Sequence, residues 1–336
     1  MIELDKSFKK PELSDDGYYY LKLETLSSVL DLICPYKKNY KALFNNLRER
    51  QRYISQFIFR GMSNSQYELI PSLYRNSINE FDGTDMQLKE FFFLRDFIEA
   101  CDSTATLIPS DSMQMRGFLK NQQTFKDMAQ KRANWVKDEW NELIAFAQHY
   151  GIPTRLLDWS YHPLVALYFA ATGAISTMYE YKIKHNSDSC FTDSCFTDLC
   201  FSIWIFADTD IVKSGENNEN RLVKIIDVPK AANQHISFQK GCFTYVEQPL
   251  NDVLSIYKGK EYQPFATINS VLKANKAQEC LIKIDIPYKY AIDLYDYCDS
   301  YNFNGATLFR GPHGSANYTM EMFKYKKVKW FLRKDA

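Results

Sequence analysis

The stretch from residue 140 to residue 173 constrains the fold more than any other part of the chain. Its N-terminal part carries apolar residues at helical spacing, which predicts a helix with one buried face. Gly151 and Pro153 are expected to end that helix. Residues 163–171 are almost entirely apolar, so they predict a second, buried helix. Between the two helices, residues 154–159 predict a short strand.

This linking segment contains two charged residues that need an explanation. Arg155 and Asp158 flank Leu156 and Leu157, between two helices that are both predicted to be buried. A charged side chain in such a place is stable only with a partner or with access to water. The two residues therefore either pair with each other inside the protein or face a cleft. For Asp158 the internal pair is the better interpretation.

The composition indicates a folded protein with a large core. The 336 residues are 46% hydrophobic and 15% aromatic, and Lys+Arg and Asp+Glu each total 41. With no net charge, the chain has no overall basic field to attract nucleic acid. The N-terminus lacks the apolar segment of a signal peptide, and no apolar run approaches the roughly 18 residues of a membrane span. We expect a cytoplasmic protein with no membrane partner.

Several classes of chemistry find no support in the motifs. The eight cysteines form no CxxC pair, so we expect reduced thiols rather than disulfides or a metal site. The sequence contains no P-loop, GxGxxG or HExxH motif and no Ser-His-Asp order. Kinase, dehydrogenase, hydrolase and metalloenzyme functions are therefore not indicated, and no metal is expected.

The other patterns predict an α+β domain of mainly antiparallel strands over residues 1–336. Helices are predicted in an N-terminal region, 25–50, in a helical insertion, 76–139, and in a short segment, 288–301. A tandem Cys-Phe-Thr-Asp repeat predicts a low-complexity surface loop over 181–200. Strands are predicted at 18–23, 53–61, 66–75, 201–207, 235–245 with a break at Gly241, 279–287 and 326–332.

Separated pieces of the chain resemble, in order, the FRG-domain family, which is named after Phe59-Arg60-Gly61. The further pieces are Leu69–Leu73, Gln148–Trp159, Ala166–Ala170 and Gln239–Phe243. The resemblance covers most of the chain. Phe309-Arg310-Gly311-Pro312-His313-Gly314 departs from the acidic turn that the family tends to show near its C-terminal end.

The layout of these pieces is similar to that of ADP-ribosyltransferases, in which a first strand ends in a functional Arg and a late strand carries Glu or Gln. This resemblance implies an ADP-ribosyltransferase-like core of mainly antiparallel strands in a split sheet. It also implies NAD as a substrate and an intracellular macromolecule, protein or RNA, as the acceptor. The protein would then be a bacterial toxin or anti-phage effector, with an antitoxin protein as a corollary partner.

Under this resemblance, Arg60 and Gly61 would bind the pyrophosphate of NAD. The guanidinium fork binds phosphate oxygens in pairs, and a glycine lets the backbone approach. The competing interpretation of Arg60 is a structural bond to Asp158 or to a loop carbonyl. The two interpretations of Arg60 are close.

Gln239 would hydrogen-bond the ribose as its glycosidic bond breaks, with Glu247 and Glu321 as carboxylate alternatives. Glu321 is expected to be a solvated charge.

His149 is a candidate general base, and a helix-end histidine bonded to a carbonyl explains it equally well. The other residues expected at the NAD site are Tyr150, Thr154, Arg155, Asp158, Trp159 and Tyr168. An aromatic ring among these, or Phe169, would stack on the nicotinamide, although Tyr168 and Phe169 also suit a core.

Two further functions stay open beside the enzyme. One is a non-catalytic sensor that binds a nucleotide on the same fold. The other is an interaction module, in which the aromatic-rich segments 76–135 and 181–200 dock a partner. A nucleic-acid acceptor would need a local basic face, for which Lys120–Lys137 is the candidate; a solvated helix face explains that segment as well.

Overall fold

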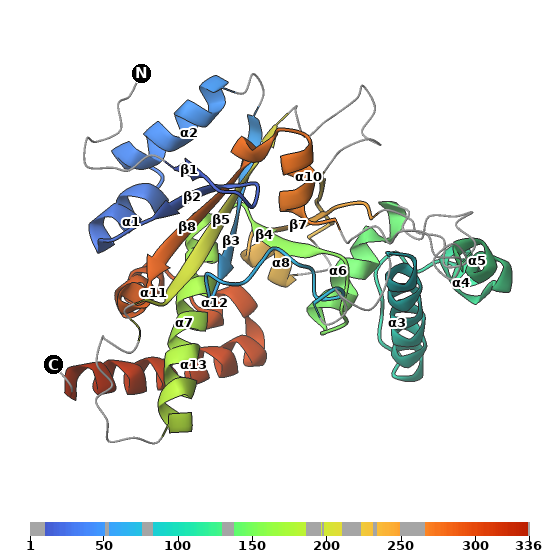
Figure 1. Cartoon of the computed structure of the whole chain (residues 1–336). Helices are drawn as coiled ribbons and strands as arrows, with labels where there is room; N and C mark the ends of the chain where they lie inside the picture. The colour runs from blue at the N-terminus through green and yellow to red at the C-terminus, as the bar shows by residue number, and fades with distance from the viewer. Residues whose placement is uncertain are drawn as a thin grey trace.

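The computed structural model describes residues 11–50, 54–75, 83–129, 138–185, 196, 198–209, 223–230, 234–248 and 266–334. Within these residues, eight strands form one sheet in the order β1-β2-β8-β5-β3-β4-β7-β6 (Figure 1). β2 and β8 are parallel, and the other neighbouring strands are antiparallel. The strands are β1 Glu12–Leu13, β2 Tyr19–Lys22, β3 Ile54–Met62, β4 Leu157–Ser160, β5 Cys200–Thr209, β6 Lys224–Ile226, β7 Gly241–Tyr245 and β8 Leu281–Pro287.

Helices surround this sheet, so the predicted α+β class is confirmed. α1 and α2 lie within 25–50, and α3, α4 and α5 lie within 76–139. The helices are α1 Leu26–Ile33, α2 Lys38–Arg50, α3 Gly83–Ser103, α4 Met113–Lys120, α5 Gln122–Ala129, α6 Asn141–His149, α7 Pro163–His185, α8 Gln234–Phe238, α10 Ile268–Ala274, α11 Ala291–Ser300, α12 Gly305–Phe309 and α13 Gly311–Lys334. Among the described residues, none of the helices could cross a membrane.

The described strands form one hydrogen-bonded sheet rather than a split one, but its middle is weakly joined. β3 pairs with β5 along most of its length, from Ile54 to Met62. β3 pairs with β4 at one position, Phe59 opposite Ser160. β4 then pairs with β7 over all four of its residues. The sheet therefore diverges between β3 and β4.

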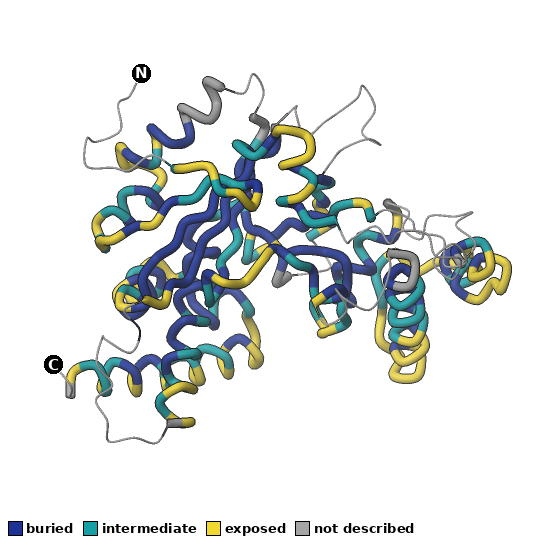
Figure 2. The backbone as a smooth tube through the Cα atoms, viewed as in Figure 1, coloured by how far each residue is buried: buried dark blue, intermediate teal, exposed yellow. Residues whose placement is uncertain are grey.

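The two faces of the sheet carry different cores, because successive side chains of a strand point to opposite faces. Phe57 and Phe59 of β3 belong to the larger core, which includes the apolar side of α7 and parts of α1 and α11. Ile58 and Met62 belong to a second core on the other face, with residues of α10. The buried residues run through the centre of the sheet (Figure 2). Arg60 alternates with Phe59, so it points away from α7.

Helix α7 packs directly on β3, and Gly61 makes this possible. A Cβ atom at Gly61 would lie 1.9 Å from the carbonyl oxygen of Ala166 and 2.8 Å from the amide nitrogen of Ala170. A second glycine, Gly173, lies one to two turns further along α7, where a Cβ would lie 2.4 Å from the Cβ of Ser63. The close approach that Gly61 allows is therefore that of a helix to a strand.

The helix–strand–helix prediction for 140–173 is confirmed, with α7 extending to His185. The predicted pair between Arg155 and Asp158 is wrong. Arg155 Nε lies 2.6 Å from Oε2 of Glu90 in α3, and the Arg155 amide donates to Oε1 at 2.8 Å. Burial lowers and the Glu90 carboxylate raises the pKa of Arg155, and the net shift is upward. Since Glu90 is fully buried, this pair anchors the linking segment to α3.

Three strand predictions are wrong in whole or in part. Residues 66–75 form turns, in which Pro71 accepts a bond from the Tyr74 amide. Residues 234–238 form helix α8, and only the part from Gly241 is a strand. The last predicted strand lies inside helix α13, because Tyr325 and Val328 are buried at helical spacing. Of the predicted loop over 181–200, residues 186–195 and 197 lie outside the described residues.

Candidate functional site

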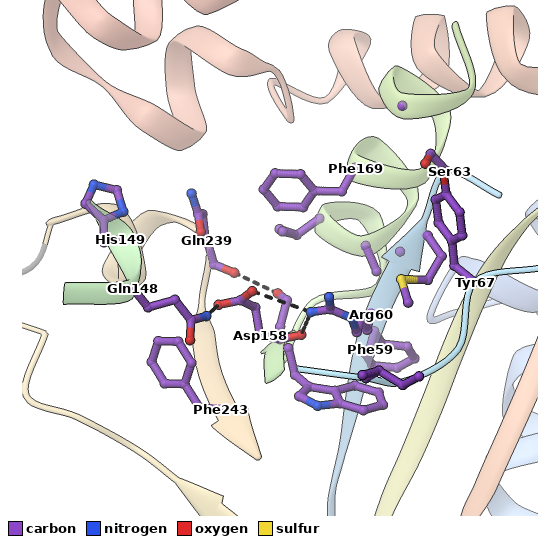
Figure 3. Close-up of a pocket in the computed structure, with 18 of the residues that line it drawn as sticks. Phe59, Arg60, Ser63, Tyr67, Gln148, His149, Asp158, Phe169, Gln239 and Phe243 are labelled. Atoms are coloured by element: carbon purple, nitrogen blue, oxygen red, sulfur yellow. Dashed lines mark hydrogen bonds and ion pairs between the residues drawn. The ribbon is translucent and has the colours of Figure 1, made fainter. Parts of the chain in front are cut away.

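The point where β3 and β4 diverge is the wall of a cavity of about 990 Å³ (Figure 3). Its lining comes from β3, β4, α6, α7, α8, β7, α12 and the turns between Ser63 and Arg75. A volume of this size is at the upper end of the usual range for small-molecule sites. The cavity is therefore large enough for a ligand the size of a nucleotide.

Arg60 lies at the centre of this wall and bonds to the neighbouring strand. Its Nη1 donates to the backbone carbonyl of Asp158 at 2.6 Å, and the same nitrogen lies 3.5 Å from Asp158 Oδ2. Its Nε is buried without a hydrogen-bond partner. Burial lowers the pKa of Arg60; the Asp158 carboxylate acts in the opposite direction, and the charge of Arg75 lowers the pKa further. The structural interpretation of Arg60 is thus confirmed by the bond to the Asp158 carbonyl, and the buried Nε keeps an unsatisfied N–H donor.

Asp158 is held by a short chain of hydrogen bonds. Gln148 Nε2 donates to Asp158 Oδ1, and the Oε1 of the same amide accepts from Thr154 Oγ1. Thr154 is fully buried, so it fixes Gln148 from inside the protein. The Asp158 side chain is 63% exposed, so its carboxylate faces solvent in the cavity. Figure 3 shows Gln148, Asp158 and Arg60 in a row along one wall.

Gln239 reaches the cavity from the opposite side of β4. It follows α8, and its carbonyl accepts a bond of 2.7 Å from Ser160 Oγ. The side-chain Nε2 donates to the carbonyl of Leu308 at 3.5 Å. The next residue, Lys240, has a φ of 47° and turns the chain into β7. The amide of Gln239 therefore shares the cavity with Arg60 and Asp158 (Figure 3).

The expected site residues divide into two groups. Arg60, Gly61, His149, Asp158, Trp159 and Gln239 line the cavity. The other four lie outside its lining: Tyr150, Thr154, Arg155 and Tyr168. Tyr150 is 63% exposed against Phe146 and His149, and the Tyr168 hydroxyl donates to Glu321.

The ring of Trp159 is part of the core rather than of a stacking surface. Its Nε1 donates to Thr244 Oγ1 at 2.7 Å, and the residue is 4% exposed. The aromatic residues of the lining that are more exposed than Trp159 are Tyr67, Phe169 and Phe309, whereas Phe243 is buried (Figure 3).

Neither of the alternative carboxylates lines the cavity. Glu247 pairs with Lys224 Nζ at 2.6 Å. Glu321 accepts bonds from the Tyr168 hydroxyl and from the Gly305 amide, and burial raises its pKa. The expectation that Glu321 is a solvated charge is wrong.

Polar and aromatic residues of the lining that were not predicted include Tyr67, Glu68, Arg75 and Gln148. The first three lie in the turns that the sequence pattern suggested as a strand. Arg75 Nε donates to the carbonyl of Ile70 at 3.1 Å, which orients its guanidinium. Their clustering with Gly, Pro and Ser is a turn signal that the apolar residues obscured. In the part of the chain that the structure describes, no cluster of His, Cys, Asp or Glu could hold a metal.

The fold and the cavity define an α+β domain organised around one tripeptide. Phe59 belongs to the core, Arg60 faces the cavity and Gly61 seats helix α7. Residues 55–177 match the family model of the FRG domain, so the chain carries an FRG domain and the resemblance to this family is confirmed over these residues. A search of curated proteins gave no match, and neither did a search of solved structures.

Proposed function

We propose that the cavity binds NAD and that the protein transfers ADP-ribose to an intracellular macromolecule, a protein or RNA. The observation that carries this proposal is the wall on which Arg60, with an unpaired Nε, lies beside the Asp158 carboxylate. The activity would suit a toxin or anti-phage effector, which a host cell must restrain with an antitoxin protein.

The pyrophosphate of NAD would lie between Arg60 and Arg75. Both line the cavity, and they are close enough for the charge of Arg75 to lower the pKa of Arg60. Two like charges near each other in a partly buried site repel, and a bound dianion removes that repulsion. Guanidinium groups form strong, paired hydrogen bonds with phosphate oxygens.

The nicotinamide and its ribose would lie further along the wall. Phe169 and Tyr67 offer ring faces for the nicotinamide. As the bond from ribose C1′ to the nicotinamide nitrogen breaks, its electron pair leaves with nicotinamide and positive charge develops on the ribose. The Asp158 carboxylate would stabilise this charge, and the Gln239 amide would hydrogen-bond the ribose.

The acceptor completes the reaction. Its nucleophilic oxygen or nitrogen forms the new bond to C1′ and loses a proton. His149 is the candidate base for this proton, since it lines the cavity at the end of α6.

Transfer of label from NAD carrying a labelled adenylate phosphate to total cell protein and RNA tests the proposal. The wild type should label one class of acceptor, and Asp158→Asn should reduce labelling by about 100-fold if the carboxylate stabilises the transition state. Glu247→Gln, which changes a carboxylate outside the cavity lining, is the matched control and should label normally. Equal labelling by Asp158→Asn and the wild type would exclude the proposed role of Asp158.

A nucleotide sensor without catalysis is the second candidate. Gln148 and Arg60 both approach the Asp158 carboxylate, which leaves it less free to act on a substrate. Gln239 is neutral, so it would stabilise a positively charged ribose less than a carboxylate would. A sensor would bind NAD saturably and release no nicotinamide. The labelling experiment, combined with a binding titration, separates the two functions.

A further inference from the structure

Helix α13 presents an unusual outer face on the side of the molecule away from the sheet (Figures 1 and 2). Its inner side is buried through Tyr325 and Val328, and it packs against α7. On the outer side, Phe323 is 45% exposed and Trp330 is 55% exposed. These residues are seven apart, so they lie nearly in line along the helix, about 10 Å from each other.

Basic residues flank this aromatic line. Between Met322 and Arg333 the sequence has five basic residues and no acidic one. Lys324 lies 3.7 Å from Glu180, and Lys329 lies 3.0 Å from Asp296, so these two charges are compensated. Lys326, Lys327 and Arg333 are exposed on the outer side. We call Phe323, Lys326, Lys327, Trp330 and Arg333 the α13 outer face.

The end of α7 extends the apolar part of this surface. The rings of Tyr179 and Phe323 lie 5.9 Å apart, which brings the two helices together here. Ile183, one turn beyond Tyr179 on the same face of α7, is 58% exposed. Large apolar side chains are thus exposed on two adjacent helices beside exposed positive charge.

The positive charge of the α13 outer face, together with its exposed rings, indicates which kind of partner it can bind. A second copy of the chain would bring the same basic residues face to face, which is unfavourable. Duplex nucleic acid offers phosphates but no apolar surface along a groove for Phe323 and Trp330. Proteins that bind single strands hold them in a basic groove, whereas α13 runs along the outside of the molecule (Figure 1). An anionic bilayer offers both a negative surface and an apolar layer just beneath it.

We propose that the α13 outer face binds the surface of membranes that contain anionic lipids, with α13 parallel to the membrane plane. Phe323 and Trp330 enter the boundary between headgroups and acyl chains, and Lys326, Lys327 and Arg333 contact the headgroups. This inference does not depend on what the cavity binds. It would place the enzyme or sensor at a membrane surface without a membrane-spanning segment.

Sedimentation of the full chain with two kinds of vesicle tests this proposal. The wild type should bind vesicles of phosphatidylcholine mixed with phosphatidylserine, bind phosphatidylcholine alone much more weakly, and release as salt is raised. Lys326→Ala with Lys327→Ala should weaken binding roughly 25-fold, at about fivefold per charge. Lys120→Ala with Lys126→Ala, which removes the same charge from α4 and α5, should bind like the wild type.

The aromatic contribution is tested at constant charge. Phe323→Ser with Trp330→Ser should weaken binding at least about tenfold, because two rings no longer enter the bilayer. Tyr36→Ser with Leu107→Ser, at positions 88% and 91% exposed elsewhere, is the matched control. All variants change exposed positions, so their melting temperatures should match that of the wild type.

Three results would overturn the proposal. They are equal binding to both kinds of vesicle, no binding to either, and equal loss in test and control variants. A parallel titration with fluorescent single-stranded RNA tests whether the α13 outer face binds nucleic acid instead of a membrane. RNA binding that is lost in the α13 variants, without vesicle binding, would assign the face to nucleic acid.

Discussion

Arg60 Nη1 donates to the carbonyl oxygen of Asp158 at 2.6 Å, beside the one position where β3 and β4 pair. The Arg60 side chain thus joins β3 to β4 at a point where the backbones of the two strands no longer pair. The same residue lines the cavity that this divergence creates. One guanidinium thus joins two strands and lines the cavity, so experiments on Arg60 must measure both stability and binding.

Arg60→Ala should reduce the free energy of unfolding by about 2 kcal/mol, because a mostly buried, charge-assisted bond between strands is lost. Chemical denaturation followed by circular dichroism measures the change. Arg95→Ala is the control, since Arg95 on α3 bonds to its neighbour Asp96 at the surface, and it should stay within about 0.5 kcal/mol of the wild type. Equal stability of the two variants would mean that the bond from Arg60 does not hold the sheet together.

Gly61→Ala should destabilise the protein by more than about 3 kcal/mol or prevent folding. The new Cβ would overlap the carbonyl of Ala166, and neither backbone can move without separating α7 from β3. Gly117→Ala is the matched control, because nothing lies within 4 Å of a Cβ at this position in α4. The control should be stabilised by about 0.5–1 kcal/mol, as expected for a glycine inside a helix. A well-folded Gly61→Ala protein would contradict the proposed packing.

His162 should make stability depend on pH. Its Nδ1 accepts a bond from the Leu164 amide at the start of α7, and burial, with a smaller effect of Lys240, lowers its pKa to about 4. The unfolded chain binds the proton near pH 6.5, whereas the folded protein does not until about pH 4. The unfolded state therefore binds more protons between these values, so stability falls as the pH falls from 6.5 to 4.

His162→Asn isolates this effect. Asparagine keeps an oxygen that can accept the Leu164 bond, but it does not titrate. Melting temperatures of the variant and the wild type, measured across the same pH range, should differ in slope below pH 6.5. Parallel curves would show that His162 does not contribute to the pH dependence.

Arg75→Ala should weaken binding of ADP-ribose by about 10- to 100-fold, because a charge-assisted contact to phosphate is lost. The stability should change little, since Arg75 is exposed and bonds one turn carbonyl. Isothermal titration with ADP-ribose and with adenosine measures the effect. The affinity for adenosine, which has no phosphate, should not change. A loss of the same size for both ligands would place Arg75 away from the pyrophosphate.

Local signals in the sequence predicted much of this structure. The ends of α1 and α6 follow from Pro35, Gly151 and Pro153, and β5 and β8 follow from runs of β-branched and aromatic residues. The FRG tripeptide pointed to Arg60, whose bond to a carbonyl of β4 is confirmed and whose binding to pyrophosphate stays a prediction.

Contacts between residues far apart in the sequence could not be predicted from local patterns. The partner of Arg155 is Glu90, on a helix 65 positions earlier, and no local pattern indicates it. The last predicted strand shows the same limit, because apolar residues alternate there as in a strand, at Val328, Trp330 and Leu332. The segment is nevertheless helical, because Tyr325 and Val328 pack into the core at helical spacing. Arg75 and Gln148 enter the site because a turn and a helix end meet there.

The rate of nicotinamide release from NAD, with cell extract supplying the acceptor, measures directly whether the cavity cleaves NAD. We expect release by the wild type and by Arg95→Lys, and a rate lower by about 100-fold for Arg60→Lys, since one ammonium cannot replace the guanidinium fork. Arg60→Lys keeps the charge, so its melting temperature shows whether the protein is folded. Release at the same rate by a folded Arg60→Lys protein would exclude the proposed role of Arg60, and no release above background by the wild type would exclude NAD cleavage by this protein.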